Sequence, residues 1–205
     1  MDRRLEANKH QQRTEQTRRR LLTAARRIFA RDGFEAAKIE DIAREAGHTR
    51  GAFYANFKNK EELFFALVQH EAGLRVAQLH RALECCPSAQ ERLKYLREYY
   101  VRHSADRQWV MVMLEFKLYA LRHGRLRARF ARALRRIRSS VKIKDLQSLL
   151  PSSVQISPNS DEMRRTALEA ALNGLVLEHA YDPKRISDKQ VASILRRVFD
   201  LLIQY

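Results

Sequence analysis

The sequence predicts an all-α protein with about nine helices and no strands. Apolar residues recur at spacings of three and four along almost the whole chain, which is the pattern of amphipathic helices rather than of half-buried strands. Gly and Pro are scarce, at 6 and 4 in 205 residues, and they fall mainly between the periodic segments. We therefore interpret most of them as helix ends.

The periodic segments set the expected order of elements. Residues 1–16 are polar and are expected to form a flexible arm. The first helix is predicted from Thr17 to Arg31, and Gly33 follows in the left-handed position that ends many helices. The remaining helices are expected at 39–46, 49–57, 60–83, 88–100, 107–122, 126–141, 161–181 and 187–202. A loop with two prolines is predicted at 151–160.

Three helix starts carry the spacing of a capping box. In this motif two residues three positions apart each accept, with the side chain, the backbone N–H of the other. These pairs are Asn59 with Glu62, Ser88 with Glu91, and Ser187 with Gln190. Each pair precedes an apolar stripe, so the caps and the periodicity predict the same boundaries.

Charge restricts the class of partner. The formal net charge is +16, which favours nucleic acid, anionic lipid or an acidic protein, and 45% apolar residues exclude a disordered polycation. No apolar stretch is long enough for a signal peptide or a membrane span, so we expect a cytoplasmic protein that does not insert into a membrane.

Catalytic and metal-binding patterns are missing from the sequence. Cys85 and Cys86 are adjacent, which matches no zinc or redox motif, and we interpret them as small apolar residues at a helix end. There is no HExxH, no GxSxG and no glycine-rich phosphate loop. We expect neither an enzyme, nor a metal site, nor a cofactor.

The helices at 39–46 and 49–57, joined through Gly47, have the lengths and spacing of a helix-turn-helix. The stretch "GHTRGAFYANFKNKEELF" mixes aromatic residues with cations, which suits an element that rests on a core and touches an anion. The residues expected at DNA are those at the start of the second helix and of the helix after it: Thr49, Arg50, Gly51, Tyr54 and Lys60.

Residues 18–67 resemble the DNA-binding domain of the TetR family of bacterial transcriptional regulators, in an AcrR-like form. The matching pieces are "RRRLLTAARRIFARDGF", "IEDIAREAG" and "TRGAFYANFKNKEELF". The resemblance implies that Phe53 and Phe57 anchor the reading helix. It also implies a helix-turn-helix DNA-binding domain at 1–60 and a helical domain for effector binding and dimerisation at 61–205.

Two positions depart from the family pattern. Lys38 stands where the family usually has a threonine that caps the second helix; lysine can contact phosphate but cannot cap. His48 replaces an apolar residue after Gly47. It is interpreted either as a half-buried histidine that donates to the backbone or as a further contact to DNA.

The resemblance implies a pocket in the second domain for a small, largely apolar effector. The expected lining is Tyr99, His103, Trp109, Met113, Glu115, Phe116 and Tyr119, with His103 and Glu115 as the polar members. The alternative is that these aromatic residues are simply core. A filled core would favour an architectural DNA-binding protein that has no effector.

The last two helices are expected to form a homodimer through a four-helix bundle. One contributes a strip of small residues, Ala167, Ala171 and Gly174, and the other an apolar strip, Val191, Leu195, Val198 and Leu202. A two-fold dimer would match a near-palindromic DNA site. The sequence therefore favours a homodimeric repressor released from double-stranded DNA by a small molecule.

A basic stretch at 122–144 holds ten Lys or Arg residues and no Asp or Glu. It is interpreted as a solvated helix face, as the mouth of a site for an anionic effector, as a second electrostatic surface for DNA, or as a membrane-surface element. The sequence alone leaves these alternatives open.

Overall fold

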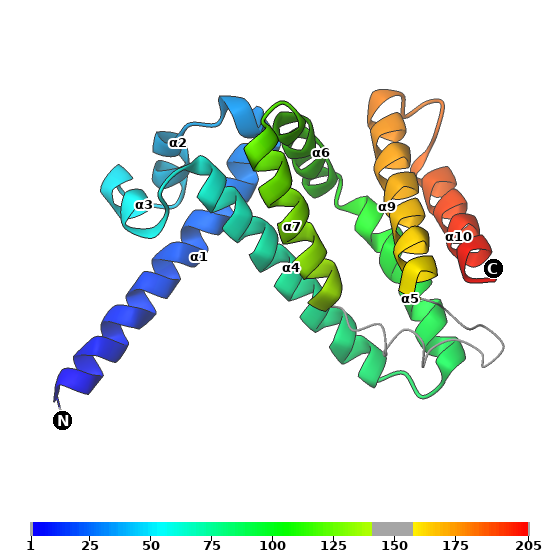
Figure 1. The fold of residues 1–205 in the computed structure, drawn as a ribbon, viewed down its shortest axis with the longest axis horizontal. Coiled ribbons are helices and arrows are strands. Elements are labelled where there is room, and N and C mark those ends of the chain that lie inside the picture. The colour runs from blue at the N-terminus through cyan, green and yellow to red at the C-terminus, as the bar shows by residue number, and fades with distance from the viewer. Residues whose placement is uncertain (1, 141–157, 205) are drawn as a thin grey trace. The chain divides into compact units, whose positions relative to one another are not determined.

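The computed structural model describes residues 2–140 and 158–204, and every regular element in these residues is a helix (Figure 1). The helices are α1 Asp2–Ala36, α2 Ile39–Glu45, α3 Arg50–Asn56, α4 Lys60–Glu84, α5 Ala89–Ala105, α6 Arg107–Leu121, α7 Gly124–Ser140, α9 Pro158–Tyr181 and α10 Asp188–Gln204. The predicted all-α fold is confirmed. None of the helices in the described residues is long and apolar enough to cross a membrane.

The helices divide into two compact units, which are described separately. The first unit comprises the residues up to Gly73 together with Glu115–Ala133, and the second comprises Leu74–Leu114 and the described residues from Leu134 onward. Helices α4, α6 and α7 each contribute residues to both units. This division reflects packing, so the predicted functional boundary at residue 60 stays a prediction.

Aromatic rings form the core of the first unit. The ring of Phe64 in α4 stacks on Phe116 of α6, with centroids 3.6 Å apart. The rings of Phe34 and Phe130 each meet Phe116 edge-on, with centroids 4.8 Å away. All four side chains are buried, so this cluster ties α1, α4, α6 and α7 together.

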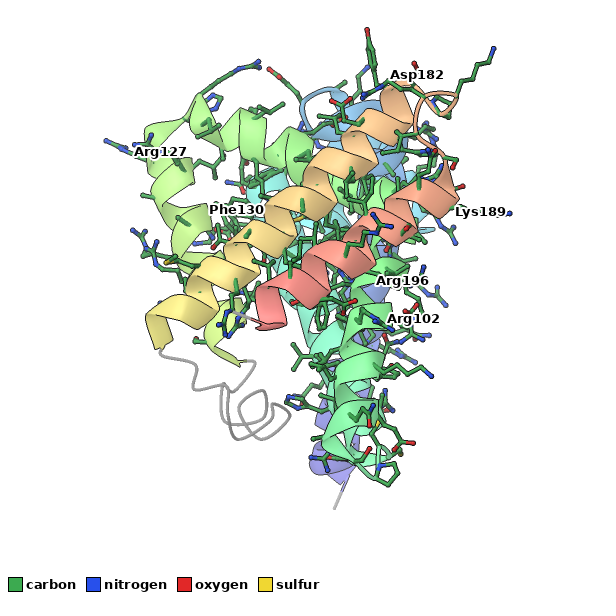
Figure 2. All side chains as sticks on the ribbon, turned by 90° about the vertical axis from the view of Figure 1, so that its right-hand side faces the viewer. Arg102, Arg127, Phe130, Asp182, Lys189 and Arg196 are labelled. Atoms are coloured by element: carbon green, nitrogen blue, oxygen red, sulfur yellow. The ribbon has the colours of Figure 1, made fainter. Side chains whose placement is uncertain are left out.

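The second unit is built on α5, α9 and α10, which pack against one another (Figure 2). Its buried side chains include Leu96, Leu168, Leu172, Val176, Leu195 and Phe199. Across the edge of this packing, Arg196 of α10 donates to both carboxylate oxygens of Glu98 in α5, each at 2.8 Å. The pairing lowers the pKa of Glu98 and fixes α10 on α5.

The predicted caps are found at the helix starts. At α10 the box forms in full: Ser187 donates its N–H to Gln190 Oε1 at 2.8 Å, and Gln190 donates its N–H to Ser187 Oγ at 3.4 Å. At α4 only half of it forms. Asn59 Oδ1 accepts the N–H of Glu62 at 2.8 Å, but the Glu62 carboxylate pairs with Arg129 of α7.

Three helices begin earlier than predicted, α7 by only two residues, at Gly124. The arm expected at 1–16 is helical from Asp2, because this stretch is rich in Glu, Gln, Lys and Arg, which are good helix formers even without an apolar stripe. α9 begins at Pro158, since proline suits the first position of a helix. The rest of the predicted loop, 151–157, lies outside the described residues.

Candidate nucleic-acid interface

The turn between α2 and α3 depends on Gly47. Its φ of 71° lies in a region that side-chain-bearing residues rarely adopt. The N–H of Gly47 donates to the carbonyl of Arg44 at 3.0 Å, and the N–H of His48 donates to that of Ala43 at 2.9 Å. This is the Schellman arrangement, which ends α2 and redirects the chain into α3.

The start of α3 presents polar groups on an exposed surface. Thr49 Oγ1 accepts the N–H of Ala52 at 3.3 Å, so Thr49 caps α3 as predicted. Arg50 pairs with the Glu40 carboxylate at 2.9 Å and donates to the Tyr54 hydroxyl at 3.3 Å. These side chains are exposed, so the ion pair is weak and Arg50 can exchange Glu40 for a DNA phosphate or base.

The opposite side of α3 is fixed to the core. Phe53 and Phe57 are buried, with ring centroids 5.8 Å apart. The guanidinium of Arg18 in α1 lies 4.5 Å from the centroid of the Phe57 ring and donates to the carbonyl of Asn56 at 3.4 Å. A cation is favoured at this carbonyl end of a helix. Sequence reasoning missed Arg18 because its contact spans 38 positions.

The turn that leads into α2 is held from two sides. Gly33 has φ 77° and ψ 166°, a combination that is almost exclusive to glycine and differs from the predicted left-handed helical position. Glu115 of α6 accepts the N–H of Phe34 at 3.2 Å. Lys60 of α4 donates to two carbonyls of the same turn, at 2.7 and 2.9 Å.

Lys60 therefore has a structural role at the position predicted to contact phosphate. Its partial burial lowers the pKa of its ammonium, and its Nζ lies 4.9 Å from the centroid of the Phe34 ring. An ammonium has three donors, so two carbonyls leave one for a phosphate. The DNA contact of Lys60 stays a prediction.

Three further predicted residues lie around α2 and α3. Lys38 is exposed and precedes α2 without a side-chain cap, in line with the loss of the family threonine. Gly51 is exposed on α3. His48 is partly buried, but its Nε2 finds no hydrogen-bond partner among the described residues, so no backbone acceptor meets that atom.

We expect Gly33→Ala to lower the free energy of unfolding by about 1–3 kcal/mol, because the backbone conformation is strained for any residue with a Cβ. The added Cβ would also lie 2.7 Å from Glu115 Oε2, and moving that carboxylate breaks its bond to Phe34. Urea unfolding measures the decrease.

Gly73→Ala is the matched control, because Gly73 lies inside α4 and, apart from its two chain neighbours and the nearby backbone of that helix, no described atom lies within 4 Å of the new Cβ. It should raise stability by up to about 1 kcal/mol. Equal effects of the two substitutions would contradict the strain at Gly33.

The predicted effector residues are divided between the two units. Phe116 and Tyr119 belong to the first unit, where Phe116 is fully buried among other rings. Glu115 also lies there, bound to the backbone of Phe34. Phe116, Tyr119 and Glu115 therefore do not lie in the same unit as the other predicted effector residues. The predicted set does not line one site within a unit.

The remaining effector residues lie in the second unit, where His103 meets a guanidinium. Arg75 of α4 contacts both ring nitrogens of His103 and pairs with Asp106 at 3.0 Å. Its guanidinium carbon lies 5.4 Å from the centroid of the Trp109 ring. Burial, and then the charge of Arg75, lower the pKa of His103 to about 4. Tyr99 lies beside it, with ring centroids 5.3 Å apart.

The predicted dimer strip on α10 is wrong for Val191 and Leu195. Both are buried against their own chain, with exposed fractions of 5% and 0%, so they cannot contact a partner. Val198 and Leu202 are partly buried in the packing of the same unit. The apolar residues of α10 serve intrachain packing first, and periodicity alone cannot show what covers them.

The small-residue strip on α9 faces outward. Ala167 and Gly174 are exposed, and Ala171 is half-buried at the edge. Six exposed apolar or small residues of α9 repeat at spacings of four and three: Met163, Ala167, Ala170, Gly174, Leu177 and Tyr181. Ile194 and Leu201 of α10 are also exposed. We call the six residues of α9 the α9 strip. Together with Ile194 and Leu201 they form an apolar face of α9 and α10 that the described part of the chain leaves exposed.

Two short helices joined by a glycine turn, the second anchored by aromatic rings and exposing arginine and tyrosine, define a helix-turn-helix DNA-binding protein. Comparison with known proteins agrees. Residues 21–67 match the family of bacterial regulatory proteins called tetR, and residues 89–204 match the C-terminal domain of BetI-type transcriptional repressors. The chain belongs to the TetR family of transcriptional regulators.

Curated relatives are similar mainly in the first domain. The chain is 41% identical over 58 residues to the HTH-type transcriptional regulator AcrR of Shigella flexneri, covering 28% of this chain and 27% of that protein. It is 29% identical over 118 residues to the HTH-type transcriptional repressor NicS of Pseudomonas putida, covering 56% and 54%. The aligned part is thus less than two-thirds of either relative.

Solved structures are similar over nearly the whole chain. A TetR-family regulator from Rhodococcus sp. has a TM-score of 0.72 at 21% identity, covering 92% of this chain and 99% of that one. FadR from Bacillus subtilis, in complex with stearoyl-CoA, has a TM-score of 0.64 at 18% identity, covering 90% and 96%. A regulator from Saccharomonospora viridis, in complex with choline, has a TM-score of 0.69 at 22% identity, covering 89% and 95%.

Proposed function

We propose that the protein is a homodimeric repressor that binds a near-palindromic operator and is released from it by a small molecule. The observation that carries the DNA-binding part is the exposed start of α3, where Arg50 and Tyr54 stand on a helix that Phe53 fixes to the core. A reading helix must be rigid, because base contacts discriminate only when their donors are held in place.

The DNA contacts proposed for this surface fall into two groups. Arg50, Thr49 and Tyr54 at the start of α3 meet base edges and adjacent phosphates, and Gly51 allows the backbone to approach closely. Lys38, His48 and Lys60 lie at the neighbouring helix ends and meet phosphates, where backbone amides also favour an anion.

The α9 strip supports the homodimer. Its spacing of four and three is that of helices that pack side by side, and Gly174 and the alanines permit close approach of a second helix. Two copies of α9 and α10 form a four-helix bundle, with Leu177 and Leu201 buried between them. A dimer also places two reading helices on two half-sites.

The part of the proposal that concerns the effector depends on the second unit. Structures of the same fold carry stearoyl-CoA and choline, as described above, which supports a ligand site in a protein of this fold. We assign the polar end of the site to His103 and its partner Arg75, and the apolar part to Tyr99, Trp109 and Met113. The effector must bind more tightly to a conformation in which the two reading helices no longer fit the operator.

The proposal is tested by selecting an operator from random DNA duplexes with the purified chain, and then by placing charge in the α9 strip. Ala170→Glu with Gly174→Glu should convert a dimer into monomers in sedimentation. Because a monomer engages only one half-site at a time, operator affinity should fall by about a hundredfold or more. The selected operator then serves to screen small molecules for release of the bound protein.

Ala180→Glu is the matched control, because Ala180 is exposed on α9 outside the strip. It should remain dimeric and bind the operator normally. If the double variant also stays dimeric, the interface lies elsewhere. If no operator is selected at all, the repressor function itself is wrong.

A further inference from the structure

The helix α7 carries an arginine row that neither operator recognition nor the dimer explains. Arg125, Arg129 and Arg132 stand on α7 at spacings of four and three, and Arg122 precedes them in the turn. All four are exposed. No Asp or Glu occurs from residue 122 to residue 140. Like charges at these spacings repel one another, so the row is unfavourable without an anion.

Most of the row has no counter-charge among the described residues. Arg122, Arg125 and Arg132 have no ion-pair partner among the residues that the structure describes. Arg129 differs: it donates to the Glu62 carboxylate at 2.6 Å, and its guanidinium carbon lies 4.2 Å from the centroid of the Phe65 ring. Arg129 therefore fixes the row on α4, while its neighbours point to solvent.

The side of α7 next to the row is committed to the core of the first unit. Phe130 is 4% exposed, and its ring lies edge-on to Phe116 with centroids 4.8 Å apart. Figure 2 shows Phe130 toward the interior, and Arg127, which is not part of the row, projecting away from the protein. A helix that binds a lipid surface inserts its apolar face among the acyl chains. The apolar face of α7 is occupied, so a membrane does not fit this helix.

Phosphate is the anion that suits the row. The planar fork of arginine matches the geometry of phosphate oxygens and gives two parallel hydrogen bonds. From Arg125 to Arg132 the helix rises about 10 Å, and a duplex of that length carries about six phosphate charges. We propose that the arginine row of α7 is a second DNA-binding surface, which binds duplex phosphates without reading sequence and independently of α3.

The test compares three proteins on a random-sequence duplex. They are the wild type, the row variant with Arg122→Gln, Arg125→Gln and Arg132→Gln, and a control variant with Arg81→Gln, Lys184→Gln and Lys189→Gln. The control removes the same net charge from exposed positions outside α7. Fluorescence anisotropy measures affinity from about 50 to 200 mM salt. Thermal unfolding checks that both variants keep the wild-type fold.

The row variant should flatten the slope of log affinity against log salt by about 0.9 for each phosphate that is no longer neutralised, or about 2.7 in all. The control should keep the wild-type slope. Equal flattening by both variants would show that charge is spread over the surface and would overturn the proposal, as would an unchanged slope for the row variant.

Vesicles of phosphatidylcholine and phosphatidylglycerol test the competing partner. If the row variant loses vesicle binding while its DNA slope stays unchanged, the surface binds lipid and the proposal is wrong. The DNA in this experiment has random sequence, so failure to find an operator would not affect the result.

Discussion

Phe116→Ala should lower the free energy of unfolding by about 3–5 kcal/mol, as expected for a fully buried aromatic ring replaced by a methyl group. The ring is 0% exposed and has buried aromatic neighbours on several sides, with Phe64 stacked on it at 3.6 Å between centroids. Removing it leaves a cavity that these rings cannot fill without leaving their own positions. Urea unfolding measures the destabilisation.

This substitution decides between the two interpretations of Phe116, as the wall of an effector site or as core. Leu118→Ala is the control, since Leu118 lies on the same helix with 57% of its surface exposed, and its effect should stay within about 0.5 kcal/mol. If Phe116→Ala costs no more than the control, Phe116 is not a core residue. If the Phe116→Ala variant kept its stability but a ligand raised its melting temperature less than that of the wild type, Phe116 would belong to the effector site.

The helix-turn-helix could be predicted from the sequence because its determinants are local. Gly47 is needed for a positive φ, Thr49 caps the helix that follows, and Phe53 and Phe57 stand one helical turn apart. Each of these effects acts within a few residues, so no knowledge of distant packing is required. The bounds of α2 and α3 accordingly differ from the predicted ones by no more than one residue.

The effector residues illustrate what periodicity cannot predict. It correctly indicates that Trp109 and Phe116 are buried, but burial does not say against which partner. Trp109 lies in the second unit and Phe116 in the first, although both belong to α6. The hydrogen bond between Glu115 and Phe34 spans 81 positions, so no spacing pattern could have revealed it.

α10 illustrates a second limit. Its apolar residues cover a wide arc, and the sequence cannot divide that arc between the chain's own core and a partner. Val191 and Leu195 are buried inside, whereas Ile194 and Leu201 face outward. The division follows from how α5 and α9 pack on α10, which is a property of the tertiary structure.

His103 should make the protein less stable at acidic pH. Its pKa is lowered to about 4 in the folded protein, while an unfolded histidine has a pKa of about 6.5. Between these values the unfolded chain binds a proton that the folded protein does not. Stability that is present above pH 6.5 is therefore lost as the pH falls towards 4, by about 3 kcal/mol in total.

The cause is the environment of the imidazole, and a variant can isolate it. Burial disfavours the charged ring, and the guanidinium of Arg75 adds repulsion that the Asp106 carboxylate only partly offsets. His103→Asn removes the titrating group, so its stability should fall less steeply between pH 6.5 and 4 than that of the wild type. Urea unfolding at a series of pH values gives both profiles. His123→Asn, at an exposed histidine, should keep the wild-type profile, and parallel curves for wild type and His103→Asn would contradict the assignment.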